Sequence, residues 1–408
     1  RAPLPRARGS RERRPGRLAE AARPAEAPGP TSTSSGGQRW SAEVRAPSRE
    51  PAMKRPAARA AAGGGAAKGR GAPLLDLGRG LVRAELVRRP SARNRAPWVA
   101  DVVLADGRTA LAHCPALDMG GLCVPGTQLL MKQAVDSRGQ PVGSEAVGPY
   151  GTPKCEYILQ LVWIAEPENA DMGGCWCAAH PSLGERLAAA LLEKGLIKEV
   201  PNPTDIRKEV SGVAGSNMRA DFVVQHGKNA ASVVEVKTVL NTDYSPATAP
   251  ERRECVYLGA GKPYRRAGIF PWGRVAQTGP DGERVVSARA IKHVDELAAL
   301  AQKRSAPVRW MPLLLFMVVR PDVTSLRINE ESCPSFARHT AAAKAAGVRM
   351  VAHKVRWGTD RDIGRAFWMG TVPVRIPQGA TRAAKTGTKR PASTPASKRR
   401  VSARTSPR

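Results

Sequence analysis

The sequence predicts an α/β (α+β) protein in which an OB-like small β-barrel is followed by an α/β domain, with disordered basic tails at both ends. Short segments with β character, separated by turn residues, fill the first part of the folded region. From Ser182 onward, amphipathic helical patterns alternate with apolar strands. Both ends of the chain have almost no large apolar side chains and cannot form a core. We therefore expect a disordered region at 1–72, an OB-like domain at 74–170, an α/β domain at 173–360 and a disordered tail at 379–408.

Five β segments predict the barrel. Each contains β-branched or other apolar residues, and turn signals such as Asp106-Gly107 and Pro125-Gly126 separate them. Five short strands at this spacing suit an OB-like fold, whose open face commonly binds oligonucleotides. The expected strands are Gly80–Arg88, Trp98–Leu104, Arg108–His113, Gln128–Lys132 and Tyr157–Ile164.

Helices and strands alternate in the second domain. Ser182 is expected to begin a helix, with Glu185 at the capping-box spacing and an end at Lys194-Gly195. The Pro- and Gly-rich segment at about 241–284 is expected to be an insertion or a mobile loop. Further helices are expected at Ser287–Lys303 and Pro334–Ala346, and strands at Met311–Val319 and Val348–Trp357.

The charge of the chain points to a polyanionic partner. The net charge is +30, and residues 1–72 carry 16 basic and 5 acidic side chains, while residues 379–408 carry 9 basic and none acidic. The residues between still carry 40 basic and 30 acidic side chains. Basic side chains that neutralise phosphates release condensed counterions, so DNA is the expected partner. For the tails alone, the alternative is that their charge only keeps the chain soluble.

The number of cysteines and the length of the apolar runs indicate where the protein resides. Seven cysteines, an odd number over a long chain, disfavour a secreted disulfide framework and indicate a reducing intracellular environment. Cys175-x-Cys177 lacks the paired spacing of a structural zinc site, so buried cysteines are expected there. The longest apolar run, Met311–Val319, is shorter than the roughly 18 residues of a membrane span, and we expect no membrane partner. No small-molecule cofactor is evident.

Short signals in the tails favour the nucleus and leave an organelle open. Lys389-Arg390 and Lys398-Arg399-Arg400 resemble a split nuclear-import signal. An Arg-rich leader with few acids is also typical of an organellar transit peptide. Because the first methionine is Met53, the residues before it are alternatively an upstream extension of the reading frame.

Two carboxylates and a lysine are predicted to meet on one hairpin. Phe222–Val224 and Ser232–Val239 are expected to be its strands, joined by a turn. In such a strand Glu235 and Lys237 point to the same face, and Asp221 comes directly before the other strand. Carboxylate oxygens are the ligands that Mg²⁺ prefers, and a neighbouring amine can orient a water or stabilise developing charge. Asp221, Glu235 and Lys237 thus suffice for a Mg²⁺-dependent nuclease site, although the bare spacing also suits an ordinary surface ion pair.

The wider sequence resembles the sugar fermentation stimulation protein (SfsA) family. The resemblance covers roughly Val82 to Trp357 in chain order and implies an OB-like N-terminal domain, a PD-(D/E)XK nuclease-like C-terminal domain and DNA binding. It implies that Asp221 and Glu235 bind the metal and that Lys237 joins them in the catalytic core. The motifs that carry it are Arg95 with Ala100-Asp101-Val102, Asp106-Gly107, Ala112-His113-Cys114-Pro115, Met119, Pro125-Gly126, Glu209-Val210, Ser216–Phe222, Val234–Thr238, Phe270-Pro271, Ile291-Lys292-His293 and Glu296-Leu297.

The same motifs suggest further site residues. Glu209, Lys292 and His293 are expected to support the site, against the alternatives of a salt bridge for Glu209 and a solvated helix face for the other two. Arg95, Arg219 and Lys292 are expected to contact nucleic acid.

The chain departs from the family pattern at two places. Ala116-Leu117-Asp118 stands where the family has Asn-Thr-Gly, and Trp272 stands where it has Asp. An acid that would support the site is therefore missing, while Asp221, Glu235 and Lys237 remain.

Three functions follow from these observations. The first is DNA binding of the SfsA type, largely independent of sequence because it uses phosphate contacts. The second is a Mg²⁺-dependent nuclease that uses Asp221, Glu235 and Lys237. The third is a transcriptional regulator that keeps the nuclease fold as an inactive scaffold.

Overall fold

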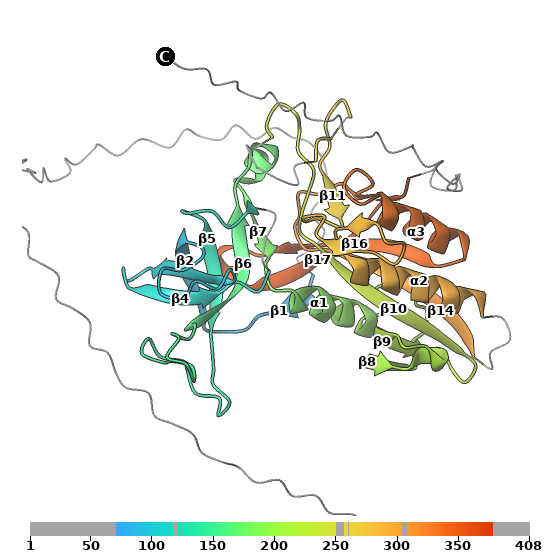
Figure 1. The fold of residues 1–408 in the computed structure, drawn as a ribbon, viewed down its shortest axis with the longest axis horizontal. Helices are drawn as coiled ribbons and strands as arrows, with labels where there is room; N and C mark the ends of the chain where they lie inside the picture. The colour runs from blue at the N-terminus through green and yellow to red at the C-terminus, as the bar shows by residue number, and fades with distance from the viewer. Residues whose placement is uncertain (1–70, 117–120, 250–256, 260, 304–307, 378–408) are drawn as a thin grey trace, which may run out of the picture. The chain divides into compact units, whose positions relative to one another are not determined.

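The computed structural model describes residues 71–116, 121–249, 257–259, 261–303 and 308–377 (Figure 1). The predicted disordered tails, except residues 71 and 72, and the predicted nuclear-import signal lie outside these residues. Within them, no helix is both long and apolar enough to cross a membrane. All the described residues belong to one compact unit.

The predicted small barrel is confirmed. Its strands pair in the order β4-β3-β2-β5-β6-β7, and a parallel pairing of β4 with β6 closes the barrel. The first barrel strand therefore pairs with the second and the fourth, and the third pairs with the fifth, which gives the closed barrel expected of an OB-like fold. The strands are β2 (Leu81–Arg88), β3 (Val99–Leu104), β4 (Thr109–His113), β5 (Gln128–Gln133), β6 (Tyr157–Ile164) and β7 (Cys175–Ala178).

A seven-stranded mixed sheet forms the α/β part of the molecule. Its order is β1-β17-β16-β14-β10-β9-β8, with β10, β14 and β16 parallel at the centre. Because helices cover both faces of these central strands, Leu313–Val318 of β14 is a continuous buried run. The strands are β1 (Leu75–Asp76), β8 (Asp205–Ser211), β9 (Arg219–Gln225), β10 (Ala230–Val239), β14 (Arg309–Val318), β16 (Arg349–Trp357) and β17 (Arg365–Val372).

Helices lie on both sides of this sheet. α1 (Ser182–Glu193) shares an apolar cluster with Val234 and Val236, while α2 (Ala288–Gln302) and α3 (Pro334–Ala345) share another with Val233 (Figure 1). Side chains of alternating strand residues point to opposite faces, so β10 contributes to both clusters. The Gly184 position lets α1 approach β10 closely, because a Cβ there would lie 1.8 Å from the Thr238 hydroxyl oxygen.

The helix ends agree with the prediction except for one cap. Ser287 caps α2 as a Ser N-cap should, since its hydroxyl accepts a hydrogen bond from the Ala290 amide at 3.2 Å. The capping box expected at Ser182 is wrong. Pro181 occupies the N-cap position of α1 and has no capping side chain. The Ser182 amide instead donates to His180 Nδ1 at 3.3 Å, and the Ser182 hydroxyl lies 2.8 Å from the same nitrogen.

The segment predicted to be an insertion or a mobile loop contains regular structure. It supplies β11 (Ala267–Phe270), which pairs in parallel with β15 (Ser325–Ile328), and β15 pairs with β18 (Val374–Arg375). β12 (Gln277–Thr278) pairs with β13 (Arg284–Val285). Strands of two to four residues are too short to show an alternating pattern, which is why the sequence did not predict them.

A buried ionic cluster joins the barrel side of the chain to the central sheet. The short helix η2 (Pro167–Met172) follows β6 and begins beside Glu166, whose carboxylate pairs with Arg266 at 2.8 Å and with Arg320 at 3.2 Å. Asp322 accepts hydrogen bonds from both arginines at 2.7 Å. Since each of these charges is paired, the cluster is a structural connection.

Candidate active site

The site lies where β9 and β10 separate. The two strands pair from Ala231 opposite Gln225 to Val234 opposite Phe222, and their ladder ends there. The next free amide of β10, at Val236, donates a hydrogen bond of 2.7 Å to Asp221 Oδ2. A carboxylate therefore replaces the missing backbone partner. The fold thus places Asp221 beside the segment that carries Glu235 and Lys237, as the sequence predicts.

Glu235 is a buried carboxylate with two unequal oxygens. Its side chain is 2% exposed, and Oε1 accepts a hydrogen bond from Lys237 Nζ at 2.5 Å and contacts His293 Nδ1. Burial opposes the charge, but the hydrogen bond from His293 and the charge of Lys237 hold the pKa of Glu235 below its usual value. Oε2 is buried and has no hydrogen-bond partner among the described residues. Glu235 is thus an ionised carboxylate with one oxygen still in need of a partner.

The pKa of Asp221 is shifted in the opposite direction to that of Glu235. Burial, and then the negative charge of Glu235, raise the pKa of Asp221 to about 6, against the smaller effects of the Val236 amide and Lys237. Two neighbouring carboxylates with pKa values displaced in opposite directions are typical of a functional site.

A third acid approaches this pair from α1. Burial raises the pKa of Glu185, and the charges of Glu209 and Glu235 raise it further, while Arg289 and Lys237 oppose the shift. The sequence prediction assigned Glu185 to a helix cap and missed its place near the site. No local pattern signals this placement, because it depends on how α1 packs on the sheet.

His293 and Lys292, both expected to support the site, lie in different environments. The His293 side chain is 10% exposed and contacts Glu235, whereas Lys292 is exposed and pairs with Glu296 at 3.8 Å. His293 Nε2 accepts a hydrogen bond of 3.4 Å from Arg289 Nε, so Nδ1 is the nitrogen that donates to Glu235. The helix spacing contained this signal, because His293 lies four residues before the buried Leu297.

Glu209 and Arg219 form an ion pair at the outer edge of the site. Glu209 lies in β8 between the residues that pair with Phe222 and Ala220, and so next to Asp221. Its φ of 55° is unusual for a residue other than glycine and indicates local strain. Its carboxylate contacts the guanidinium of Arg219. This ion pair agrees with the salt-bridge alternative for Glu209.

The residues present fit a divalent cation held by few protein ligands. No group of three or more His, Cys, Asp and Glu side chains within the described ranges is arranged to hold a metal ion. Mg²⁺, however, usually binds one or two carboxylates and completes its shell with water and phosphate oxygens. A cation bound by both carboxylates would give the buried Oε2 of Glu235 a partner and would stabilise the ionised form of Asp221, whose pKa is raised.

Arg95 lies apart from these residues, in the loop that follows β2. It is exposed and lines a pocket with Arg88, Pro90 and Ser91. The nearby Trp98 is 44% exposed. Asn94 Nδ2 donates a hydrogen bond of 3.1 Å to the Pro153 carbonyl, which ties this loop to the long connection between β5 and β6.

The cysteine pair of β7 lies in the core. Cys175 and Cys177 are buried free thiols, and burial raises the pKa of Cys175 to about 12. Trp163 and Trp176 pack edge to face with their ring centroids 5.3 Å apart, and Trp176 is buried. These side chains contribute to packing, as expected for buried cysteines.

An OB-like barrel followed by an α/β sheet with two carboxylates and a lysine at separated strands defines a protein of the nuclease-like α/β class. The chain belongs to the sugar fermentation stimulation protein family. It is 31% identical over 297 residues to the sugar fermentation stimulation protein homolog of Dinoroseobacter shibae, covering 72% of this chain and 93% of that protein. The family profile described as "Sugar fermentation stimulation protein RE domain" matches residues 280–361.

Two further proteins are similar to this chain. The homolog of Maricaulis maris is 28% identical over 274 residues, which covers 67% of this chain and 88% of that protein. The solved structure described as Pyrococcus furiosus SfsA in complex with Ca²⁺ has a TM-score of 0.49 and 17% identity, and the match covers 75% of this chain and 100% of that one.

Proposed function

We propose that this protein binds DNA mainly through the phosphate backbone and therefore largely without sequence preference. The observation that carries the proposal is the excess of basic side chains outside the tails, 40 against 30 acidic ones between residues 73 and 378. Phosphate contacts position a protein on DNA but carry no sequence information. Membership of this family supports the proposal that the nuclease-like protein contacts nucleic acid.

The barrel loops supply one surface for this binding. The loop between β2 and β3 carries Arg93, Arg95 and the partly exposed Trp98, and the connection between β5 and β6 carries Tyr150, which is 96% exposed. The hydrogen bond from Asn94 to Pro153 holds these two loops together. In barrels of this type the corresponding loops commonly contact oligonucleotides, with aromatic rings stacking on bases.

The binding proposal is tested with the full chain and labelled duplex DNA over a range of salt concentrations. Arg95→Ala should lower the slope of log affinity against log salt by about 0.9 for each phosphate that the variant no longer neutralises. Arg361→Ala, which removes an exposed cation from a short helix elsewhere in the chain, is the control. An Arg95→Ala slope equal to that of wild type and of the control would count against the barrel loops as a binding surface.

A second function, a Mg²⁺-dependent phosphodiesterase or nuclease, is favoured by the geometry at Glu235. Asp221 and Glu235 would hold the metal, which supplies charge neutralisation on a phosphate and a bound water of lowered pKa. Glu235 fixes Lys237 by their 2.5 Å contact, so the amine is held in place before any substrate binds. Lys237 would orient the attacking water or stabilise charge on the phosphate oxygens.

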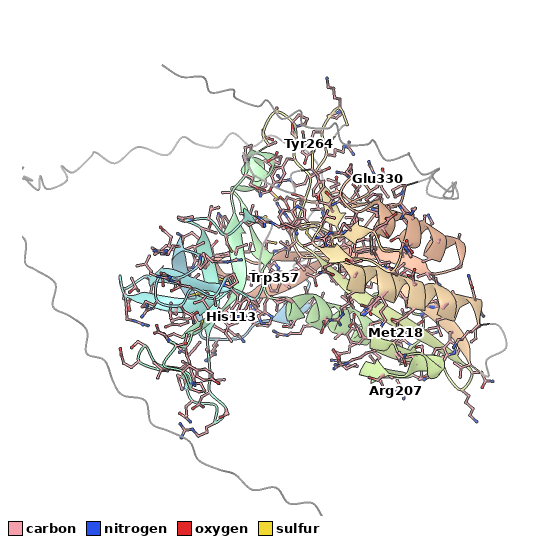
Figure 2. All side chains as sticks on the ribbon, viewed as in Figure 1. His113, Arg207, Met218, Tyr264, Glu330 and Trp357 are labelled. Carbon is pink, nitrogen blue, oxygen red and sulfur yellow. The ribbon has the colours of Figure 1, made fainter. Side chains whose placement is uncertain are left out.

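Cleavage assays separate binding from catalysis. Plasmid and branched DNA are incubated with wild type and Glu235→Ala, with Mg²⁺ and with a chelator. The nuclease hypothesis predicts cleavage that needs both the metal and Glu235, while Glu330→Gln, which alters an exposed acid elsewhere in the chain (Figure 2), leaves it unchanged. Binding without metal-dependent cleavage of any substrate would leave the binding function alone, and a sequence preference in a selection experiment would favour a regulator on an inactive scaffold.

A further inference from the structure

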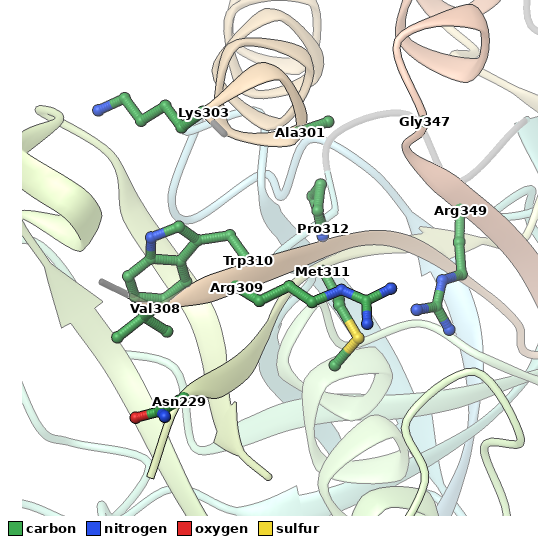
Figure 3. A pocket seen from close by; sticks show the side chains of 10 residues that line it. All are labelled: Asn229, Ala301, Lys303, Val308, Arg309, Trp310, Met311, Pro312, Gly347 and Arg349. Atoms are coloured by element: carbon green, nitrogen blue, oxygen red, sulfur yellow. The ribbon is translucent and has the colours of Figure 1, made fainter. Parts of the chain in front are cut away.

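An open pocket of about 630 Å³ lies at the edge of the sheet where β14 and β16 begin (Figure 3). Arg309 pairs with Ala230 and Leu314 with Glu235, so about 17 Å of strand separates Arg309 from the level of Glu235. Arg349 pairs with Leu313, which pairs with Val234, so Arg349 lies two strands away from β10. The lining includes Asn229 and Trp310. It also includes three cationic side chains, those of Lys303, Arg309 and Arg349.

Positive charge accumulates in this pocket. The ends of Arg309 and Arg349 point toward one another (Figure 3). Arg349 Nη1 donates to the Glu199 carbonyl at 2.7 Å, and Lys303 Nζ donates to the Ala214 carbonyl at 2.7 Å. Both acceptors are neutral, and none of these three cations forms an ion pair with an acid in the described part of the chain. Two guanidinium groups that point toward one another without acidic partners favour an anion between them, and each guanidinium matches the geometry of a phosphate.

Trp310 provides a flat apolar surface next to these cations. Because Arg309 and Trp310 are consecutive in a strand, their side chains point to opposite faces of β14. Figure 3 shows the indole on one side of the strand and the two guanidinium groups on the other. The indole is only partly buried, beside Ala301 near the end of α2. A ligand that spans this edge of the sheet could contact the two guanidinium groups on one side of β14 and the indole on the other.

We propose that this pocket binds a single-stranded segment of nucleic acid, with a backbone phosphate between Arg309 and Arg349 and an adjacent base stacked on Trp310. The inference rests on the proposed function in one respect, that nucleic acid is the partner. A strand supplies a phosphate and a base within one nucleotide, which is the combination that the pocket presents. Its volume also suits one such unit, since ligand pockets commonly measure about 300 to 1,000 Å³.

The test uses the full chain, a labelled oligothymidine of about 12 nucleotides and an abasic strand of the same length. The double variant Arg309→Ala/Arg349→Ala should bind both strands at least tenfold more weakly, with a salt slope reduced by about 0.7 for each phosphate that it no longer neutralises. Trp310→Leu should weaken oligothymidine binding by roughly 5- to 150-fold, the equivalent of one stacked base, and leave the abasic strand unaffected. Lys344→Ala, which removes an exposed cation from α3, is the control and should change neither.

Three outcomes would overturn the inference. If the double variant matches Lys344→Ala while wild type binds both strands, the pocket is no phosphate site and the proposed function stands. If inorganic phosphate or thymidine monophosphate binds wild type as tightly as the oligonucleotide, the pocket holds a small anion and no strand. If wild type binds no DNA at all, the proposed function fails as well. Circular dichroism of each variant checks that it is folded.

Discussion

At the scale of single residues, Glu235 is the centre of the candidate site. Lys237 and His293 both bind one of its oxygens, and the other is buried without a partner among the described residues. A buried charge of this kind is stable only while its partners remain. Asp221 differs, because burial and the negative charge of Glu235 raise its pKa and so oppose its ionisation.

Replacing Lys237 should therefore destabilise the protein in a pH-dependent way. The pKa of Glu235 is lowered in the native state, so its ionised form stabilises the fold above the usual pKa and this contribution is lost as pH falls. Lys237→Met should lower the free energy of unfolding by about 3 to 5 kcal/mol at neutral pH and by less in acid. Lys292→Met, at an exposed lysine that also pairs with a glutamate, should cost under about 1 kcal/mol. Urea unfolding measures both, and equal losses would contradict the assignment.

Asp221→Asn should have the opposite effect. The pKa of Asp221 is raised to about 6 from 3.8, so the native state binds the proton more tightly and loses stability as pH rises through this window. Asparagine removes the charge but can still accept the hydrogen bond from the Val236 amide. We expect the variant, without metal, to gain roughly 1 to 3 kcal/mol in free energy of unfolding at about pH 8 and nothing below about pH 4. A gain of the same size at both pH values would refute this explanation.

Protonation of Asp221 should also compete with a divalent cation. If Asp221 and Glu235 bind Mg²⁺ together, the affinity should fall as pH is lowered through about 6, because the proton and the cation use the same carboxylate. Isothermal titration of the full chain with Mg²⁺ at several pH values measures this. Affinity that does not change between about pH 5 and 8 would place the cation elsewhere.

At the scale of elements, the close packing of α1 on β10 determines which side chains reach the site. The backbone of Gly184 lies against Thr238, and this approach brings Glu185 toward the carboxylate pair. Gly184→Ala should destabilise the protein by about 1 to 3 kcal/mol through overpacking. Thr238→Ala should restore part of the loss, because it removes the atom that the new Cβ would meet. Gly143→Ala, at a position with open space, is the control for thermal unfolding, and an equal effect there would contradict the packing argument.

The elements that the sequence predicted are those with strong local periodicity. The β9–β10 hairpin, α2 and the buried strand β14 follow from repeating apolar positions, and the structure has them within a few residues of the predicted bounds. The site itself was predictable only in part. Glu235 and Lys237 share a face by strand geometry, whereas the separation of β9 from β10 that admits Asp221 is a tertiary feature. The place of Glu185 depends on helix packing, which no local spacing determines, whereas the inward direction of His293 could be predicted from its spacing to the buried Leu297.

At the scale of the whole molecule, basic charge is spread over both halves of the folded chain. Exposed arginines lie in the barrel loops near Trp98, and two arginines line the pocket at the sheet edge near Trp310. The same combination of cations and aromatic rings at two places suits one long polyanion. The departures at Ala116 and Trp272 lie outside the pair Asp221 and Glu235, so they leave the candidate site with both acids.

The affinity of the full chain for two duplexes of unrelated sequence, measured from about 50 to 200 mM salt, tests this account most directly. Binding through phosphates predicts equal affinities for both duplexes and a fall of about 10³- to 10⁵-fold over this range for 6 to 10 contacts. An affinity that does not respond to salt, or one that differs between the duplexes by more than about tenfold, would contradict it.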